Sequence, residues 1–340
     1  MRPGLLGSIA RRVGATPAGS SRRQFLKGTL ASGGLMLAGR MANAAGPAPH
    51  VIVVGAGFAG LSLGFQLRQA GARVTLLEAR NRVGGRVLSL DKFIEGRVVE
   101  GGAELIGSNH PTWMAYAKHF GLQFNDVTEL ETDKAPIILD GKRYEGAQLS
   151  ALWDRIQQAL ERMDADARTV NLDEPWKTPD AARLDRLSVA AAFASWPIDD
   201  VARRGALTLL ANDNAGWPER ESYLSAISGI AGGGYDRFWT ESEVYRCIGG
   251  NQTLAFKLAE AIGPEHIHLH TPVSRIRLTA SGVALQQADG KTVEGDAVVL
   301  TVPPSAWKHV EIEPALPPGY RPATGPAIKY LSKVSRPFWR

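Results

Sequence analysis

The sequence predicts an α/β (α+β) fold: a Rossmann-like dinucleotide-binding domain with a three-stranded meander, interrupted by a mainly helical insertion. Three observations lead to this prediction. A glycine-rich turn at residues 55–60 stands between an apolar β-branched run and a helical pattern. The middle of the chain then has helical periodicity without alternating strands. Strand signals return at residues 266–302, separated by turn residues.

Length and composition restrict the class of protein. The chain has 340 residues, of which 44% are hydrophobic and 21% charged, which is typical of a globular protein and excludes disordered, collagenous and coiled-coil classes. The length favours two domains or one large α/β unit. The single cysteine, Cys247, excludes an intrachain disulfide and a cysteine-cluster metal site. We interpret Cys247 as a small buried hydrophobic residue.

The N-terminal 44 residues read as an export signal. They contain seven of the 39 Lys and Arg residues and no Asp or Glu, including the pair Arg22-Arg23 before Phe-Leu-Lys. A short apolar run and the small-residue site Ala42-Asn43-Ala44 follow. We predict recognition by the twin-arginine export machinery and a periplasmic or secreted protein. The alternative is a disordered basic tail.

The charge of the remaining chain gives no support for a nucleic-acid partner. Without the N-terminal segment, 32 cations face 34 anions, so the formal net charge of +5 comes from that segment alone. No later segment approaches eighteen consecutive apolar residues, and we therefore expect no stable membrane span.

The first motif predicts a dinucleotide site. A strand at 51–54 leads into the glycine turn, a helix at 61–70 follows, and a second strand at 73–77 ends at Glu78. Such a βαβ unit holds a pyrophosphate at the helix N-terminus. Glu78 can bind both ribose hydroxyls and would repel a 2′-phosphate, which argues against NADP. The residues expected around the pyrophosphate are Gly55, Ala56, Gly57, Phe58, Ala59 and Gly60. The motif alone leaves FAD and NAD open.

Two later glycine segments distinguish these cofactors. Gly84-Gly85-Arg86 and Gly101-Gly102-Ala103-Glu104 would each be an ordinary turn if taken singly. In order after Glu78, they resemble the flavin-containing amine oxidase family, which includes monoamine, L-amino-acid and polyamine oxidases. The resemblance implies FAD as the cofactor. The further residues that it implies around FAD are Glu78, Ala79, Arg80, Gly84, Gly85, Arg86, Gly101, Gly102, Ala103 and Glu104.

The middle of the chain reads as the helical insertion. Helices are predicted at 113–120, 148–170, 189–195 and 201–210, with a hairpin at 136–144. The resemblance implies that this insertion belongs to a substrate domain. Aromatic residues are dense near its end and could form an amine pocket or plain core. They are Trp217, Tyr223, Tyr235, Phe238, Trp239 and Tyr245.

The cofactor domain is expected to resume after residue 246. A helix at 253–262 leads to a strand at 266–270, a meander at 273–278, 283–287 and 291–293, and a buried strand at 296–302. The resemblance implies that the backbone of Val273 pairs with the adenine. His266, His268 and His270 would share one face of their strand, but no carboxylate or cysteine completes a site, and we predict no metal.

The last residues contain the candidate catalytic side chain. Lys329 precedes Pro-Phe-Trp in an apparent strand within which the chain ends at Arg340. The resemblance implies that Lys329 holds a water against flavin N5. The family continues beyond this point, so we expect either a truncated sequence or an incomplete site.

These readings give one set of domain boundaries. They are a twin-arginine signal peptide at 1–44, a first FAD-binding part at 45–110, a substrate or cap insertion at 111–245, a second FAD-binding part at 246–310, and the start of an incomplete substrate-domain sheet at 311–340.

The resemblance implies an FAD-dependent amine oxidase. A primary amine or L-amino acid would lose a hydride to flavin N5, the imine would hydrolyse, and O2 would become H2O2. The resemblance implies that an arginine soon after Gly-Gly-Ala binds the carboxylate in relatives that use amino acids. In this sequence Glu104-Leu105-Ile106 stands there instead, which favours a simple amine. Two alternatives stay open: a non-catalytic remnant that binds FAD or a partner chain, and a dehydrogenase that uses another electron acceptor.

Overall fold

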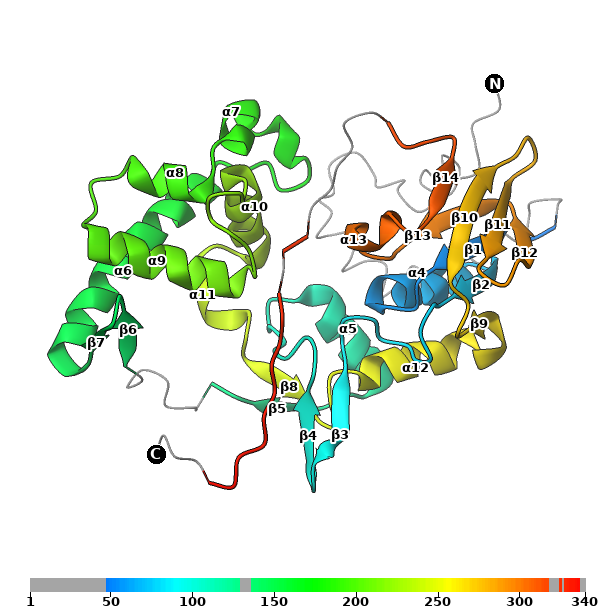
Figure 1. Cartoon of the computed structure of the whole chain (residues 1–340), viewed down its shortest axis with the longest axis horizontal. Coiled ribbons are helices and arrows are strands. Elements are labelled where there is room, and N and C mark those ends of the chain that lie inside the picture. Colours follow the sequence, from blue (N-terminus) through cyan, green and yellow to red (C-terminus); the bar gives the residue numbers. More distant parts are fainter. Residues whose placement is uncertain (1–46, 129–135, 318–323, 326, 337–340) are drawn as a thin grey trace.

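The computed structural model describes residues 47–128, 136–317, 324–325 and 327–336. Figure 1 shows two parts, a helical one on the left and an α/β one on the right, with the last described residues running between them. The predicted signal at 1–44 lies outside the described residues. Among the described residues, no helix has the length and apolar character that a membrane crossing requires.

The α/β part is built on a parallel sheet, as the βαβ pattern predicts. Its strand order is β13-β1-β2-β9. The strands are β1 (His50–Val54), β2 (Arg73–Leu77), β9 (Ile267–His268) and β13 (Ala297–Leu300), and the register sets Val51 beside Ala297 and Val74. Apolar residues fill β1, which is buried from Val51 to Val54, because helices and the meander cover both faces.

Two helices cover one face of this sheet. α4 (Phe58–Gln69) follows β1 directly and packs against α12 (Thr253–Ile262). α4 begins three residues earlier than predicted, inside the glycine motif, so its N-terminus lies at the turn itself. α5 (Pro111–Phe120) packs on this pair and ends at Gly121, whose φ of 66° explains the glycine there.

The predicted meander is confirmed on the other face. β10 (Val273–Leu278), β11 (Val283–Gln287) and β12 (Thr292–Gly295) are antiparallel neighbours. A fourth strand, β14 (Glu311–Glu313), pairs with β10 in parallel orientation. The sequence did not predict β14, because three residues are too few for a periodic pattern.

The helical part has its own hydrophobic core. α6 (Gly146–Ala167), α9 (Asp200–Asp213) and α10 (Tyr223–Gly233) pack on one another, with α7 (Ala181–Arg186), α8 (Val189–Ala194) and α11 (Asp236–Glu241) around them. Of the aromatic residues singled out in the sequence, Tyr223 is 2% exposed and Trp217 is 59% exposed. Tyr223 is therefore core, and Trp217 lies at the surface.

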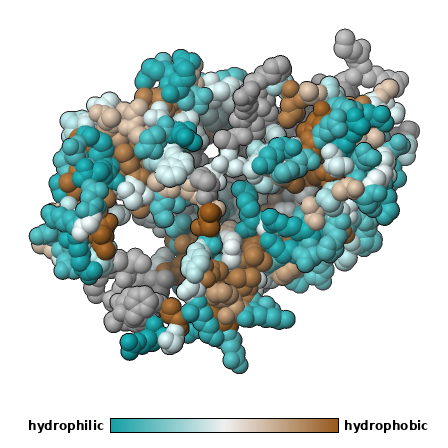
Figure 2. All heavy atoms as spheres, in the orientation of Figure 1, coloured by the Kyte–Doolittle hydropathy of each residue, from teal (hydrophilic) through white to brown (hydrophobic). Residues whose placement is uncertain are grey.

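Three two-stranded sheets complete the fold, and one of them joins the two parts. β5 (Phe124–Asp126) and β8 (Tyr245–Cys247) pair in antiparallel orientation, joining the two ends of the insertion. The predicted hairpin is confirmed as β6 (Ile137–Leu139) and β7 (Lys142–Tyr144). β3 (Ser89–Ile94) and β4 (Arg97–Glu100) form another hairpin. Figure 2 shows hydrophobic residues gathered low in the centre of this face, where Figure 1 places β3, β4, β5 and β8.

One predicted strand is shorter than expected, and another is not formed among the described residues. His266 lies in a 3-10 turn (Pro264–His266), β9 spans only two residues, and His270 has a φ of 53°, so the three histidines do not share one face of a strand. The turn at Pro264–His266 includes the first residue of the predicted strand. The described residues 327–334 around Lys329 are extended but unpaired, so the predicted terminal strand is not formed there.

Candidate functional site

The glycine turn brings backbone N–H groups to one point. Gly57 is the N-cap of α4, and no side chain caps the helix, which leaves its first N–H groups available for an anion. Gly55 has a φ of 105°, and a Cβ on Gly60 would lie 1.9 Å from the carbonyl oxygen of Gly55. These two glycines are required by the fold. A Cβ on Gly57 would meet only the Cα of Gly85, at 3.8 Å. The space beside the Cα of Gly57 is therefore open.

Glu78 lies at the carboxyl end of β2, beside this turn. Glu78 is 8% exposed, and its two carboxylate oxygens accept the backbone N–H groups of Ala56 at 2.8 Å and of Arg80 at 2.9 Å. An ionised carboxylate has about four acceptor positions, so acceptor capacity remains for hydroxyl groups. This is the residue for which the sequence analysis predicts binding of the ribose hydroxyls.

The Gly84–Arg86 turn lies against the glycine motif. Gly84 forms a parallel bridge with Gly57, and its N–H donates to the carbonyl of Ala56 at 2.8 Å. Arg82 braces the turn from within, since its guanidinium donates to the carbonyl of Gly85 at 2.9 Å. The side chain of Arg86 is exposed, and no ion pair or hydrogen bond joins it to any described residue. Arg86 is therefore a cation available to a phosphate.

The Gly101–Glu104 segment packs on the same turn from the other side. Ala103 donates its N–H to the carbonyl of Arg86 at 3.1 Å, and a Cβ on Gly102 would lie 2.0 Å from that oxygen. Lys329 reaches this segment from 225 residues away. Its ammonium donates to the carbonyl of Gly102 at 3.3 Å and forms an ion pair with Glu104. The structure therefore brings the candidate catalytic lysine onto a predicted flavin segment.

Arg246 is a further member of this cluster that the sequence analysis missed. Its guanidinium forms an ion pair with the other carboxylate oxygen of Glu104, so Glu104 lies between two cations. Arg246 belongs to β8, and no motif marked it, because its contact depends on how β8 pairs with β5.

Three buried polar residues hold these turns in place, and the sequence analysis did not identify their role. Asn251 is 2% exposed; its amide donates to the carbonyls of Ala103 at 3.2 Å and Glu104 at 2.8 Å. Gln252 donates to the carbonyl of Val83 at 2.8 Å. Glu100 accepts the N–H of Asn251 at 2.8 Å. The only sequence signals were the place of Asn251 and Gln252 after Gly249-Gly250, before a helix, and the place of Glu100 before Gly101-Gly102.

Val273 begins the meander close to Glu78. Two residues shortly before it form hydrogen bonds with the turn after β2. The backbone N–H of His270 donates to the carbonyl of Arg80 at 2.9 Å, and that of Thr271 donates to the carbonyl of Glu78 at 2.8 Å. Val273 is 9% exposed. The chain thus places Val273 at the same edge of the sheet as the predicted ribose ligand.

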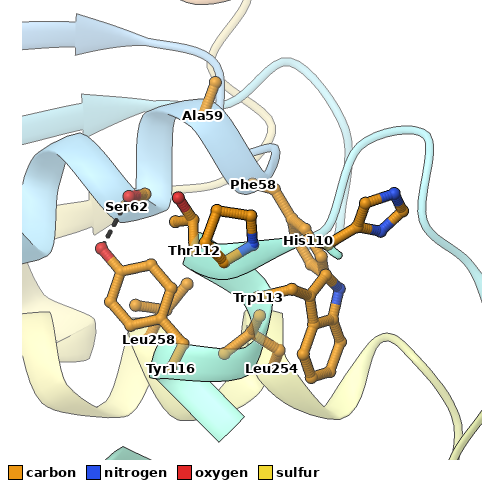
Figure 3. A pocket seen from close by; sticks show the side chains of 10 residues that line it. Phe58, Ala59, Ser62, His110, Thr112, Trp113, Tyr116, Leu254 and Leu258 are labelled. Atoms are coloured by element: carbon orange, nitrogen blue, oxygen red, sulfur yellow. Dashed lines mark hydrogen bonds between the residues drawn. The ribbon is translucent and has the colours of Figure 1, made fainter. Parts of the chain in front are cut away.

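A cavity of about 460 Å³ lies between α4, α5 and α12 (Figure 3). Phe58 and Ala59, at the start of α4, line it. The hydroxyl groups of Ser62 and Tyr116 are hydrogen-bonded at 2.7 Å. Burial lowers the pKa of His110, which favours its neutral form. This cavity therefore suits uncharged, apolar groups.

Neither cysteine nor metal chemistry is supported by the described residues. Burial and the charge of Glu100 raise the pKa of Cys247 to about 11, so its thiol is protonated at neutral pH. No three histidine, cysteine, aspartate or glutamate residues of the described chain are grouped as metal ligands would be.

Comparison with known proteins decides the family. Residues 58–340 match the model of the flavin containing amine oxidoreductases. The chain belongs to this family. Putrescine oxidase of Kocuria rosea is 28% identical over 314 residues, covering 85% of this chain and 65% of the relative. Nicotine dehydrogenase of Pseudomonas putida is 28% identical over 273 residues, covering 79% and 56%.

The solved structures agree with the fold. Cyclohexylamine oxidase of Brevibacterium oxydans superposes with a TM-score of 0.69 at 26% identity, covering 80% of this chain and 61% of that one. The chain thus spans less than two thirds of the length of each of these three proteins.

The residues of this chain fit the family's cofactor, FAD. The uncapped N-terminus of α4, the open space beside Gly57 and the guanidinium of Arg86, which pairs with no described residue, suit the pyrophosphate. Glu78 has acceptor capacity for the ribose. The predicted roles of the individual residues, including Val273, stay predictions.

Proposed function

We propose that the protein catalyses oxidative deamination of a primary amine, with O2 as the final electron acceptor and H2O2 as a product. The observation that most supports this proposal is the contact of Lys329 with Gly102 and Glu104 beside the FAD-binding turns. FAD, when bound, would supply the acceptor for the hydride that leaves the α-carbon of the amine.

The chain's own residues would bind and orient the cofactor. The N–H groups at the start of α4 and the guanidinium of Arg86 would hold the pyrophosphate, and Glu78 would accept the ribose hydroxyls. Asn251 fixes the segment that contains Glu104, which in turn orients Lys329. We propose that the Lys329 ammonium holds a water molecule by donating a hydrogen bond to it.

A simple amine fits this cluster better than an amino acid. An amino-acid substrate needs a cation for its carboxylate. Arg246 stands near Lys329, but its guanidinium is paired with Glu104. Both cations of the cluster are thus already paired with Glu104, which favours a substrate that has no carboxylate group.

A second candidate differs only in the electron acceptor. One relative is a nicotine dehydrogenase. This similarity supports a dehydrogenase that passes electrons to a carrier other than O2 as the second candidate. We also propose that the protein is exported by the twin-arginine route, on the basis of Arg22-Arg23 and the residues that follow.

The test is peroxide release from the flavin-loaded protein with a panel of primary amines and amino acids. We expect amine-dependent H2O2. Reduction of an artificial dye without peroxide would favour the dehydrogenase. A flavin-loaded protein that is inert to the whole panel in both assays would refute the proposal.

A further inference from the structure

The carboxylate of Glu104 is held by two cations, one at each of its oxygens. Oε1 pairs with Nη2 of Arg246, and Oε2 pairs with Nζ of Lys329. The cations come from separate segments, because Arg246 belongs to β8 and Lys329 to the extended residues 327–334. The three side chains are between 32% and 42% exposed, so small solutes can reach the cluster.

The two cations are spaced as a carboxylate-binding site requires. Each of them contacts a different oxygen of one carboxylate group, and these two oxygens share a single carbon atom. A guanidinium and an ammonium would bind the carboxylate of a separate molecule at the same two points in the same way. Arg246 and Lys329 thus form a carboxylate site that is filled by a side chain of the same chain.

The backbone that carries Glu104 is fixed, which strengthens its hold on this site. The buried amide of Asn251 donates to the carbonyls of Ala103 at 3.2 Å and of Glu104 at 2.8 Å. A binding group that belongs to the same molecule competes at a high effective concentration with any solute. Because these hydrogen bonds go to backbone atoms, they do not depend on the Glu104 side chain, and a substitution there should leave the segment in place.

The charges around the cluster also disfavour an external anion while Glu104 is present. Burial, together with the charges of Asp213 and Glu104, raises the pKa of Glu243, so this carboxyl lies within electrostatic range of Glu104. Glu104 satisfies Arg246 only in part, since the buried Nε of Arg246 has no hydrogen-bond partner among the described residues. The guanidinium therefore has capacity for another acceptor once Glu104 is removed.

We infer that Lys329 and Arg246 form a carboxylate-binding subsite, and that Glu104, by filling it, is the residue that excludes substrates with a carboxylate beside the reacting amine. The inference rests on the proposed function for the identity of the excluded substrates. The filled subsite itself can be tested without turnover. Removal of the Glu104 side chain should open the subsite to a small carboxylate from solution.

An ordinary surface ion pair would behave differently. When one partner of such a pair is removed, the other is solvated by water and needs no ligand. The chain contains a pair of this kind in α11, where Arg237 and Glu241 are 2.6 Å apart and four residues apart in the sequence. Among the described residues, no other cation pairs with Glu241. Glu241→Gln is therefore the matched control, because it releases one arginine without a second cation at the same carboxylate.

The experiment measures acetate binding by calorimetry on the flavin-loaded protein, at constant ionic strength and with acetamide as the uncharged analogue. We expect Glu104→Ala to bind acetate about tenfold or more tightly than the unaltered protein does, the effect of charged hydrogen bonds. Acetate should also raise the Tm of this variant, because it binds only the folded state. Acetamide should do neither. Adding Arg246→Gln to Glu104→Ala should abolish the gain, and Glu241→Gln should show none.

A second measurement concerns the exclusion of substrates. Propylamine and 2-aminobutyrate differ only by the carboxylate on the carbon that bears the amine. The unaltered protein should prefer propylamine, and in Glu104→Ala the ratio of the two kcat/KM values should fall about tenfold or more. If Glu104→Ala fails to fold, Glu104→Ser replaces it, since serine also leaves the space open.

The outcomes distinguish failure of the subsite from failure of the proposed function. Equal acetate affinity in the folded Glu104 variant and the unaltered protein would overturn the subsite, as would a gain that persists without Arg246 or an equal gain in Glu241→Gln. An unchanged preference for propylamine in an active Glu104 variant would overturn the role in exclusion. Acetate binding that requires both the loss of Glu104 and the presence of Arg246, in a protein that oxidises no amine, would support the subsite and refute the oxidase.

Discussion

Replacing Gly57 by alanine is expected to separate cofactor binding from folding. The φ of Gly57 is −76°, which alanine adopts freely, and the new Cβ would meet only the Cα of Gly85, at ordinary contact distance of 3.8 Å. Alanine is a poorer N-cap than glycine, but it also restricts the unfolded chain, and these effects oppose each other. We therefore expect the free energy of unfolding of the apoprotein to change by less than about 1 kcal/mol.

The same methyl group would project into the space assigned to the pyrophosphate. We expect FAD affinity to fall tenfold or more, which corresponds to about 1.4 kcal/mol or more. The matched variant is Gly60→Ala, whose Cβ would lie 1.9 Å from a backbone oxygen of Gly55 and 2.7 Å from the hydroxyl of Thr301. Since backbone must move there, we expect a loss of stability of about 3 kcal/mol or more.

The assay combines chemical denaturation of each apoprotein with titration of FAD, followed by the quenching of flavin fluorescence. The expected result is a stable Gly57→Ala protein that binds FAD weakly and a Gly60→Ala protein that is unstable before any cofactor is added. Unchanged FAD affinity in a folded Gly57→Ala protein would refute the placement of the pyrophosphate at this turn.

Three further predictions concern positioning, export and pH. Asn251→Ala removes the three hydrogen bonds of a buried side chain and should cost about 3 kcal/mol, lowering Tm by roughly 5 °C or more and reducing FAD loading. The exposed Asn125→Ala should change neither, and an unchanged Tm in Asn251→Ala would contradict the bracing role. Replacing Arg22 and Arg23 by lysine should keep the protein in the cytoplasm, as shown by cell fractionation; normal export of this variant would exclude the twin-arginine route. Burial raises the pKa of the Asp164 carboxyl in the native state above its value in the unfolded chain. At pH values above the ordinary pKa of a carboxyl group, the charge on Asp164 therefore lowers the free energy of unfolding. Asp164→Asn should therefore have a higher Tm at pH 7, and its advantage should shrink as the pH falls towards 4; an advantage independent of pH would show that the charge is not the cause.

Local pattern was sufficient to predict the first βαβ unit. β2 has the predicted bounds, and β1 and α4 lie where the apolar run and the glycine turn place them, because strand, turn and helix are neighbours in the sequence. The same holds for α12 and the meander, whose periodicity and Asp-Gly turn are local. The helical insertion follows from a long amphipathic pattern, seen in α6.

Long-range contacts could not be predicted in the same way. The hydrogen bond from Asn251 to Glu104 joins residues 147 apart, and the pairing of Arg246 with Glu104 depends on β5 and β8 meeting. Neither residue type nor spacing signals such a contact. Conversely, the alternation of His266, His268 and His270 suggested a strand, but the turn at Pro264–His266 took precedence over it.

The measurement that tests the central claim most directly is the anaerobic reduction of bound flavin by an amine. The purified protein is loaded with FAD, oxygen is removed, and the visible absorbance of the oxidised flavin is followed after addition of 1,4-diaminobutane, butylamine or an amino acid. Because no electron acceptor is needed, the result is the same for an oxidase and a dehydrogenase. We predict that a primary amine bleaches the flavin and that Lys329→Met slows the reaction. FAD that is bound but stays oxidised with every amine of the panel would contradict the account.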